Sequence, residues 1–199
     1  MSTIGIIVGS TRPGRFSIQA AQWLLDFANQ RGDAEYVLVD IAEFDMPLFE
    51  EPASPLYAPV QNEHARAFAA RLGELDGFVF ATPEYNHSTS AALKNALDYA
   101  YAEWNFKPAG FISWGAIAGG ARAVEHLRGI LAELKVYDLR EQIVIPNFYL
   151  NFDEQGRYRF GESEARQAAP MLDELVFWTE QMKSARAIKA GQAELVGAR

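Results

Sequence analysis

Short apolar runs alternate with amphipathic stretches along the whole chain. The runs are rich in β-branched residues, and the stretches between them repeat apolar residues at helical spacing. The runs predict buried strands at residues 3–8, 36–41, 77–81, 109–114 and 142–145. The stretches predict helices at residues 18–30, 60–75, 90–101, 120–134 and 164–189.

This alternation predicts a single α/β domain over residues 1–199, with a parallel sheet covered by helices on both faces. No internal repeat or linker interrupts the pattern. Residues 42–59 are rich in proline and acidic side chains and predict a covering loop, and residues 151–161 predict a polar loop or small hairpin. Residues 190–199 lack a pattern and are expected to fray.

The composition narrows the function classes. With 49% hydrophobic residues the chain can bury a sizeable core, and its net charge of −8 argues against a nucleic-acid partner. The absence of cysteine excludes a thiol nucleophile and a disulfide framework. No apolar run approaches the roughly 20 residues that span a bilayer, and no signal-peptide pattern opens the chain. We therefore expect a cytoplasmic protein without a membrane partner.

The turn after the first predicted strand, GSTRPGRFS, carries groups suited to an anion. Ser10, Thr11 and Ser17 supply hydroxyls, Arg12 supplies a cation, and a helix N-terminus supplies unpaired N–H donors. The turn lacks the lysine of a P-loop and the G-x-G-x-x-G of a dinucleotide site, so a phosphate monoester fits better than a triphosphate or pyrophosphate. The alternative is that Ser17 only caps its helix and that both arginines of the turn are solvated.

The loop after the third strand, residues 82–89, suits a planar ring. Pro83 stiffens the backbone, Tyr85 offers a flat face, and amide groups near Asn86 suit the carbonyl and imide edge of a heterocycle. The alternative is a plain strand-to-helix turn in which a hydroxyl residue is the N-cap of the next helix, the candidates being Ser88, Thr89 and Ser90.

The loop after the fourth strand, residues 113–120, is nearly free of bulky side chains. Glycine is used where backbone approaches a ligand closely, although a Gly-Gly pair can also be only a tight turn. Ligands of doubly wound sheets bind beyond the carboxyl ends of the strands, where these three loops meet. A phosphate cradle, a stiff polar loop and a glycine-lined wall together meet the requirements of FMN.

Other chemistries lack support in the sequence. The three histidines lie far apart and predict no metal site, although His87 follows the ring-binding loop and is a candidate for substrate contact. No serine lies on a recognisable nucleophile elbow.

Three segments, at residues 9–17, 82–100 and 107–128, carry a family resemblance. They resemble the NADPH-dependent FMN reductases of the flavodoxin-like superfamily, the group that contains bacterial chromate, quinone and azo-dye reductases. The resemblance extends from the N-terminus to about residue 134 and is most specific where PEYN is followed by LKNALD.

The resemblance implies a flavodoxin-like three-layer α/β/α sandwich with five parallel strands in the order 2-1-3-4-5. FMN would bind noncovalently at the switch in strand order between the first and third strands. NADPH or NADH would reduce the flavin, and a quinone, azo compound, free flavin or metal oxyanion would then take the electrons. Because the cofactor supplies this chemistry, no side chain is expected to be catalytic.

The resemblance also assigns FMN-binding residues: Ser10, Arg12, Ser17 and the backbone around Arg15 and Phe16 for the phosphate; Pro83, Glu84, Tyr85 and Asn86 for the isoalloxazine ring; and Ser113, Gly115, Gly119 and Gly120 for the ring and ribityl chain. Trp114 and His87 depart from the family pattern, so the choice of substrate does not carry over.

Two alternatives to an enzyme remain, a flavodoxin-like electron carrier and a flavin-free interaction module on the same fold. A homodimer is also expected, with a tetramer as a further possibility. Leu97 and Tyr101 are placed on the outer face of the third helix, and residues 42–59 near the partner's flavin. The aromatic residues expected near this edge are Tyr85, Tyr99, Tyr101, Trp104, Phe106 and Trp114. The alternative is that these aromatics pack inside their own subunit.

Overall fold

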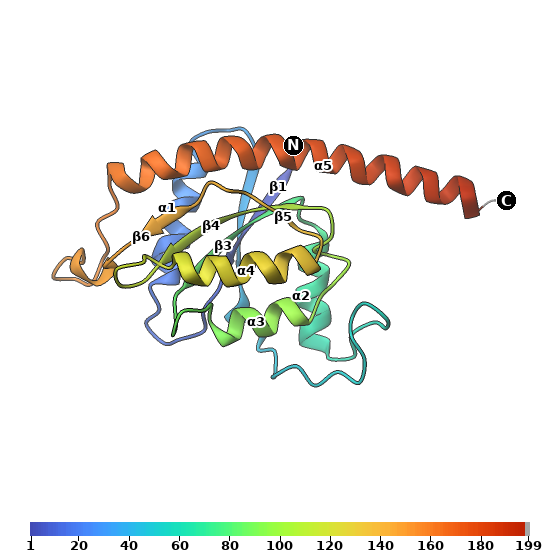
Figure 1. Cartoon of the computed structure of the whole chain (residues 1–199), viewed down its shortest axis with the longest axis horizontal. Coiled ribbons are helices and arrows are strands. Elements are labelled where there is room, and N and C mark those ends of the chain that lie inside the picture. Colours follow the sequence, from blue (N-terminus) through green and yellow to red (C-terminus); the bar gives the residue numbers. More distant parts are fainter. Residues whose placement is uncertain (198–199) are drawn as a thin grey trace.

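A twisted parallel sheet forms the middle layer of the molecule, and helices cover both of its faces (Figure 1). The computed structural model describes residues 1–197, with side chains through residue 191. The elements in chain order are β1 (Thr3–Val8), α1 (Ser17–Asn29), β2 (Glu35–Asp40), the 3-10 helix η1 (Ile41–Phe44), α2 (Glu63–Gly73), β3 (Gly77–Pro83), α3 (Ala91–Asp98), β4 (Pro108–Trp114), α4 (Ala121–Glu133), β5 (Tyr137–Asp138), β6 (Ile143–Ile145), the 3-10 helix η2 (Phe148–Leu150) and α5 (Glu162–Gly197).

The strand order β2-β1-β3-β4-β5 confirms the predicted topology and fold class. All paired strands run parallel. The strand predicted at residues 142–145 is β6, which pairs with the end of β4, and the sequence missed the two-residue strand β5, which pairs with the start of β4. The central strands β3 and β4 are buried over their full length, which explains why they read as unbroken apolar runs.

Two hydrophobic cores hold the layers together. One lies between the sheet and the pair α1 and α5, and the other between the sheet and α2, α3 and α4. In Figure 1, α5 accordingly runs along one side of the sheet and α2, α3 and α4 lie on the other. This arrangement leaves the carboxyl ends of the strands uncovered by helices, at the edge where the sequence predicts a ligand site.

Several helix boundaries differ from the sequence-based prediction. α2 begins at Glu63, since the side chain of Asn62 caps it by accepting a hydrogen bond from Ala65 N. α5 is longer than the predicted helix at residues 164–189 and continues to Gly197. The last two residues of the predicted tail, 198–199, lie outside the described residues.

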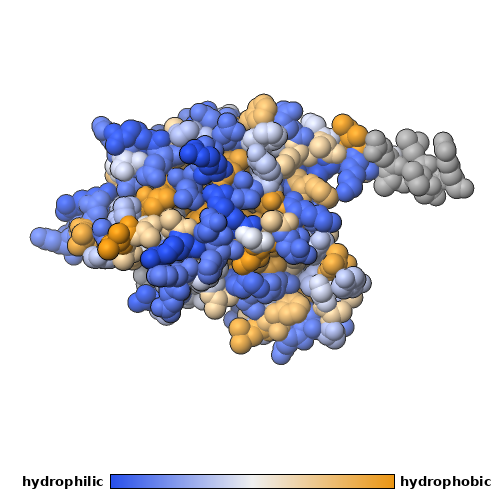
Figure 2. All heavy atoms as spheres, viewed as in Figure 1, coloured by the Kyte–Doolittle hydropathy of each residue, from blue (hydrophilic) through white to orange (hydrophobic). Residues whose placement is uncertain are grey.

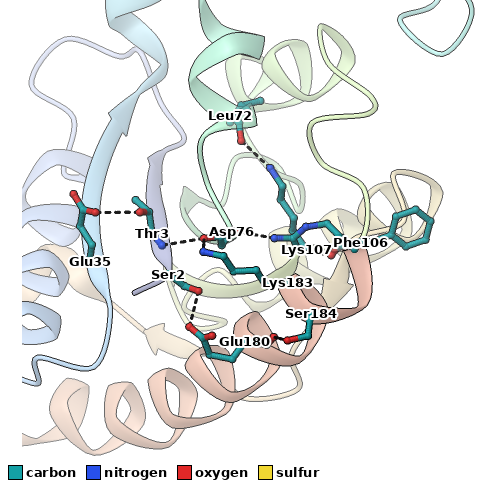
Figure 3. A network of polar contacts seen from close by, with 11 residues as sticks. Ser2, Thr3, Glu35, Leu72, Asp76, Phe106, Lys107, Glu180, Lys183 and Ser184 are labelled. Carbon is teal, nitrogen blue, oxygen red and sulfur yellow. Dashed lines mark hydrogen bonds and ion pairs between the residues drawn. The ribbon is translucent and has the colours of Figure 1, made fainter. Parts of the chain in front are cut away.

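A polar network joins α5 to the amino ends of the strands (Figure 3). Asp76 accepts hydrogen bonds from Thr3 N at 3.3 Å, Lys183 Nζ at 2.6 Å and Arg186 at 2.8 Å. Arg186 also donates to the carbonyl of Phe106 at 2.8 Å. Burial raises the pKa of Asp76, but the hydrogen bonds from Lys183 and Thr3 outweigh it and hold the pKa below its usual value.

Lys107 is a buried cation beside this network, and its ammonium donates to the carbonyl of Leu72 at 2.9 Å. Burial, aided by the charge of Arg186, lowers the pKa of Lys107 to about 8. Between this pKa and that of the unfolded chain, the unfolded state binds more protons, so stability rises with pH.

Relative to Lys107→Met, we expect the wild type to gain about 1–2 kcal/mol of unfolding free energy between pH 7 and pH 9.5. Urea unfolding at the two pH values measures this gain. The exposed Lys94 is the matched control, and Lys94→Met should show no such gain. A difference in unfolding free energy between the wild type and Lys107→Met that does not change with pH would contradict the prediction.

Candidate functional site

A cavity of about 410 Å³ opens at the carboxyl ends of β1, β3 and β4. This volume lies in the range of small-molecule sites. Its lining comprises Arg12, Pro13, Gly14, Arg15, Phe16, Gln19, Pro83, Glu84, Tyr85, Trp114, Gly115, Phe148, Phe152 and Gly156. The structure therefore brings together parts of all three loops that the sequence singled out, and adds a fourth segment that it did not.

The loop after β1 is tied to the neighbouring strand. Gly9 N donates to the carbonyl of Ala81 at 2.9 Å, and Ser90 Oγ donates to the carbonyl of Gly9 at 2.6 Å. A Cβ at Gly9 would lie 2.8 Å from Ala81 O, so only glycine fits here. Beyond it the chain turns through Arg12, whose carbonyl accepts from Arg15 N at 3.1 Å. The loop thus reaches α1 in a fixed path.

Two polar atoms at the start of α1 have no hydrogen-bond partner among the described residues. They are Arg15 Nε and Ser17 Oγ, both buried. Arg15 forms an ion pair with Asp40 at the end of β2, which uses one terminal nitrogen and leaves Nε free. Unpaired buried donors are rare, because each costs free energy. An anion at the α1 N-terminus would satisfy both.

The expected N-cap role of Ser17 is wrong. Ser17 is the first residue of α1, and Phe16 holds the N-cap position without a side-chain hydrogen bond. Because the Ser17 hydroxyl does not cap the helix, it remains available to a ligand. Ser10 is also buried, and its hydroxyl accepts from Arg12 N at 3.3 Å and lies 3.4 Å from the Tyr85 hydroxyl.

The loop after β3 is a two-residue turn. Tyr85 and Ser88 exchange backbone hydrogen bonds at 2.8 and 3.0 Å, and both central residues, Asn86 and His87, have positive φ. Of the three N-cap candidates for α3, the structure selects Ser90, which accepts from Leu93 N. The turn exposes Tyr85 at the cavity, while the lining does not include Asn86 or His87.

Glu84 faces Arg122 in the first turn of α4. Arg122 Nε donates to the Glu84 carboxylate at 2.6 Å, and Arg122 N donates to it at 3.3 Å. The carboxylate thus satisfies a free donor at the helix N-terminus. Sequence reasoning missed Arg122, since the two residues lie 38 positions apart. The pair fixes the cavity wall at Glu84 to α4.

The loop after β4 reaches the cavity at Gly115. Gly115 lines the cavity, but Ser113, Gly119 and Gly120 are buried behind it. Ser113 Oγ donates to the carbonyl of Gly119 at 3.0 Å, and a Cβ at Gly119 would lie 2.4 Å from Val144. An added Cβ at Gly120 would likewise lie 2.6 Å from Trp114 N. Glycine at these two positions therefore allows close packing of protein atoms, and their expected contact with a ligand stays a prediction.

Thr11 does not line this cavity. It is exposed and borders a second cavity of about 460 Å³ between η1 and α3. The described residues contain no cluster of three or more His, Asp or Glu side chains able to hold a metal. No helix among the described residues is long and apolar enough to span a membrane.

The fourth segment of the lining comes from the region after β6, where Phe148, Phe152 and Gly156 face the cavity. These residues surround Phe16, whose ring lies 5.1 Å from Phe148 and 5.6 Å from Phe152. The sequence predicts a polar loop or small hairpin at residues 151–161, and the antiparallel bridge between Phe152 and Tyr158 confirms the hairpin. Its aromatic residues, spaced among polar ones, were the signal that this segment packs against the rest of the chain.

Three of the six aromatic residues expected near a subunit interface are buried inside their own chain. Tyr99, Trp104 and Trp114 are buried, and so is Leu97, which was wrongly placed on the outer face of α3. The Trp114 ring packs edge-on against Phe16 at 5.2 Å. Tyr85, Tyr101 and Phe106 remain partly exposed. These buried residues therefore give no support for an interface.

Comparisons with known proteins agree with the site. The sequence model of a family described as NADPH-dependent FMN reductase matches residues 2–149. An NAD(P)H-dependent FMN reductase of Pseudomonas aeruginosa is 33% identical over 186 residues, covering 89% of this chain and 95% of the relative. A 2-hydroxy-1,4-benzoquinone reductase of a Burkholderia species is 37% identical over 158 residues, covering 76% of this chain and 79% of the relative. Among solved structures, the flavoenzyme NAD(P)H:acceptor oxidoreductase FerB of Paracoccus denitrificans has a TM-score of 0.74 at 25% identity, covering 92% of this chain and 99% of its own.

Proposed function

Because the chain belongs to the family of NADPH-dependent FMN reductases, we propose that its carboxyl-edge cavity binds FMN and serves reduction of a quinone or flavin. The protein is an FMN-dependent oxidoreductase that takes its electrons from NAD(P)H. Azo compounds and metal oxyanions remain further acceptors within the proposal.

One observation carries the assignment of the cavity. The buried atoms Arg15 Nε and Ser17 Oγ, next to the exposed cation of Arg12, find no hydrogen-bond partner in the part of the chain that the structure describes. A phosphate monoester supplies the acceptor oxygens that these donors lack, and a helix N-terminus favours its charge. The FMN phosphate would therefore be held by Arg12, Arg15, Ser17 and the backbone of this turn.

The other lining residues suit the rest of the cofactor. Pro83, Tyr85 and Gly115 would border the ring, and the Glu84–Arg122 pair would keep that wall in place. When bound, FMN supplies the hydride-accepting ring, so the protein has only to position it and leave one face open to substrates. Ser10 would position Tyr85 through their hydroxyl contact.

Anaerobic reduction tests the proposed function. The protein is reconstituted with FMN, freed of unbound flavin, and mixed with NADPH or NADH. We expect the visible flavin absorbance to bleach and to return on addition of p-benzoquinone. Initial rates at several fixed quinone concentrations should give parallel double-reciprocal lines, as two substrates using one ring face in turn require. Bound flavin that neither nicotinamide reduces would instead indicate an electron carrier, and a protein that ignores FMN would indicate an interaction module.

Replacing Arg12 should weaken FMN binding without unfolding the domain. A charge-assisted hydrogen bond contributes about 1.5–3 kcal/mol, so Arg12→Ala is expected to raise the FMN dissociation constant roughly tenfold to hundredfold. Quenching of flavin fluorescence by apoprotein measures the constant. Arg66→Ala, on α2, is the control and should leave it unchanged. An unaltered constant for Arg12→Ala would place the phosphate elsewhere.

We further propose that the protein is a homodimer that buries α3 and the loop between η1 and α2. This loop exposes four large apolar or aromatic side chains, Leu48, Phe49, Leu56 and Tyr57. In Figure 2, orange atoms lie at the lower edge of the molecule, where Figure 1 places α3 and this loop. Grouped apolar side chains on a surface often mark an interface.

Light scattering during size exclusion measures the assembly. The proposal expects twice or four times the chain mass of 22.2 kDa, and the mass of a single chain would contradict it.

We also propose that the reaction takes place in the cytoplasm, where NAD(P)H is plentiful.

A further inference from the structure

The segment after η2 forms a hairpin over residues 151–159, just beyond residues 2–149 that the family model matches. Asn151 and Arg159 are joined by two hydrogen bonds of 2.7 and 3.0 Å. At its tip, the carboxylate of Asp153 accepts from the backbone N–H groups of Gln155 at 2.9 Å and Arg157 at 2.8 Å. These backbone bonds lower the pKa of Asp153. The hairpin thus has a defined shape of its own.

One side chain of α1 fastens this hairpin to the start of that helix. Gln19 Nε2 donates to the carbonyl of Gly156 at 3.0 Å, and Gln19 Oε1 accepts from Tyr158 N at 2.8 Å. Gln19 lies in the first turn of α1, two residues after Ser17. Figure 1 shows the hairpin in orange at the far left, beside the end of α1 at which these bonds form.

The hairpin also packs on the turn that would hold the phosphate. The Phe16 ring lies 5.6 Å from Phe152, 4.9 Å from Tyr158 and 5.9 Å from Phe160. Phe16 stands between Arg15 and Ser17, whose Nε and Oγ atoms have no hydrogen-bond partner among the described residues. The position of the Phe16 ring therefore fixes the two groups that a phosphate would use.

We propose that hairpin 151–159 is a specificity-determining element that positions the 12–17 turn, so that the site selects a flavin with a terminal phosphate over one without it. Gln19 and Phe16 link the hairpin to the turn, so the position of the hairpin sets the position of the turn. The inference rests on the proposed FMN site and adds to it the reason why FMN is preferred to riboflavin. Selectivity would come from a segment of the last quarter of the chain, which itself presents only Phe152 and Gly156 to the cavity.

The test compares FMN and riboflavin, because only FMN carries the phosphate. Dissociation constants for both flavins are measured by fluorescence quenching with apoprotein of the wild type, Gln19→Ala and Asp153→Ala. We expect both variants to raise the FMN constant about tenfold and the riboflavin constant less than twofold. Asp153 does not line the cavity, so its effect cannot be a lost contact with the ligand.

Gln22→Ala is the matched control, since Gln22 lies on the same helix and, within the described part of the chain, its side chain bonds only to Asp26. It should leave both constants unchanged. If the wild type binds FMN but the ratio of the two constants is unaltered in Gln19→Ala and Asp153→Ala, the inference is overturned and the proposed function stands. The inference is also overturned if only Gln19→Ala changes the ratio, since that would mark a direct contact. Failure of the wild type to bind FMN would overturn both proposals.

Discussion

Phe16→Ala is expected to lower the free energy of unfolding by about 3–5 kcal/mol, the usual loss when a buried phenylalanine is truncated. Phe16 is buried, and five aromatic rings surround it, those of Trp114, Phe148, Phe152, Tyr158 and Phe160. Truncation would leave a cavity at the point where α1, β4 and the hairpin meet. Such a loss is a large part of the 5–15 kcal/mol by which a domain of this kind is stable.

Urea unfolding followed by circular dichroism measures this effect. Phe177→Ala is the control. Because Phe177 on α5 is 55% exposed, its truncation should lower the free energy of unfolding only slightly. We also expect Phe16→Ala to bind FMN more weakly under conditions where it is still folded, since Arg15 and Ser17 lose their fixed positions. A loss of unfolding free energy below 1 kcal/mol would show that the aromatic cluster does not depend on Phe16.

Gly120→Ala is expected to lower the free energy of unfolding by at least about 3 kcal/mol. Gly120 is the N-cap residue of α4 with a φ of 89°, a conformation that disfavours residues with a Cβ. The added Cβ would lie 2.6 Å from both Trp114 N and Ser113 Cβ, and the backbone of a buried strand cannot yield to it. The strain and the steric clash therefore act together.

A second glycine of the same helix provides the control. Gly129 lies in the interior of α4, and no atom comes within 4 Å of a Cβ added there. Gly129→Ala should stabilise the protein by about 0.5–1 kcal/mol through the higher helix propensity of alanine. Urea midpoints of the two variants should thus move in opposite directions. A Gly120→Ala variant as stable as the wild type would contradict the close packing of α4 on β4.

The layers and the strand order could be predicted from the sequence because buried strands appear in it as runs of apolar or small residues. β3 and β4 are covered on both faces, so every position is apolar or small, and their length is unmistakable. β5 left no such trace, since Tyr137 and Asp138 are too few to show a period. The edge of the sheet was therefore predicted as one strand where the structure has two.

The site was predictable where its residues follow strands, and not where distant segments meet. Residues 12–16, 83–85 and Gly115 come together because parallel strands end at one edge. By contrast, the pairing of Glu84 with Arg122 depends on how α4 packs. The space beside Gly119 is likewise filled by Val144 from another strand. Contacts of this kind have no local pattern in the sequence.

The bond between Gln19 and Gly156 spans 137 residues, and this separation sets an order of events during synthesis. At 5–20 residues per second, a ribosome adds Gly156 roughly 7–27 s after Gln19, which lies beside the proposed phosphate-binding turn. For most of that interval the nascent chain carries the turn without the hairpin residues Phe152 and Tyr158 that pack on Phe16. For the FMN site proposed above, cofactor loading is therefore expected to be a late step, completed when the last quarter of the polypeptide has left the exit tunnel.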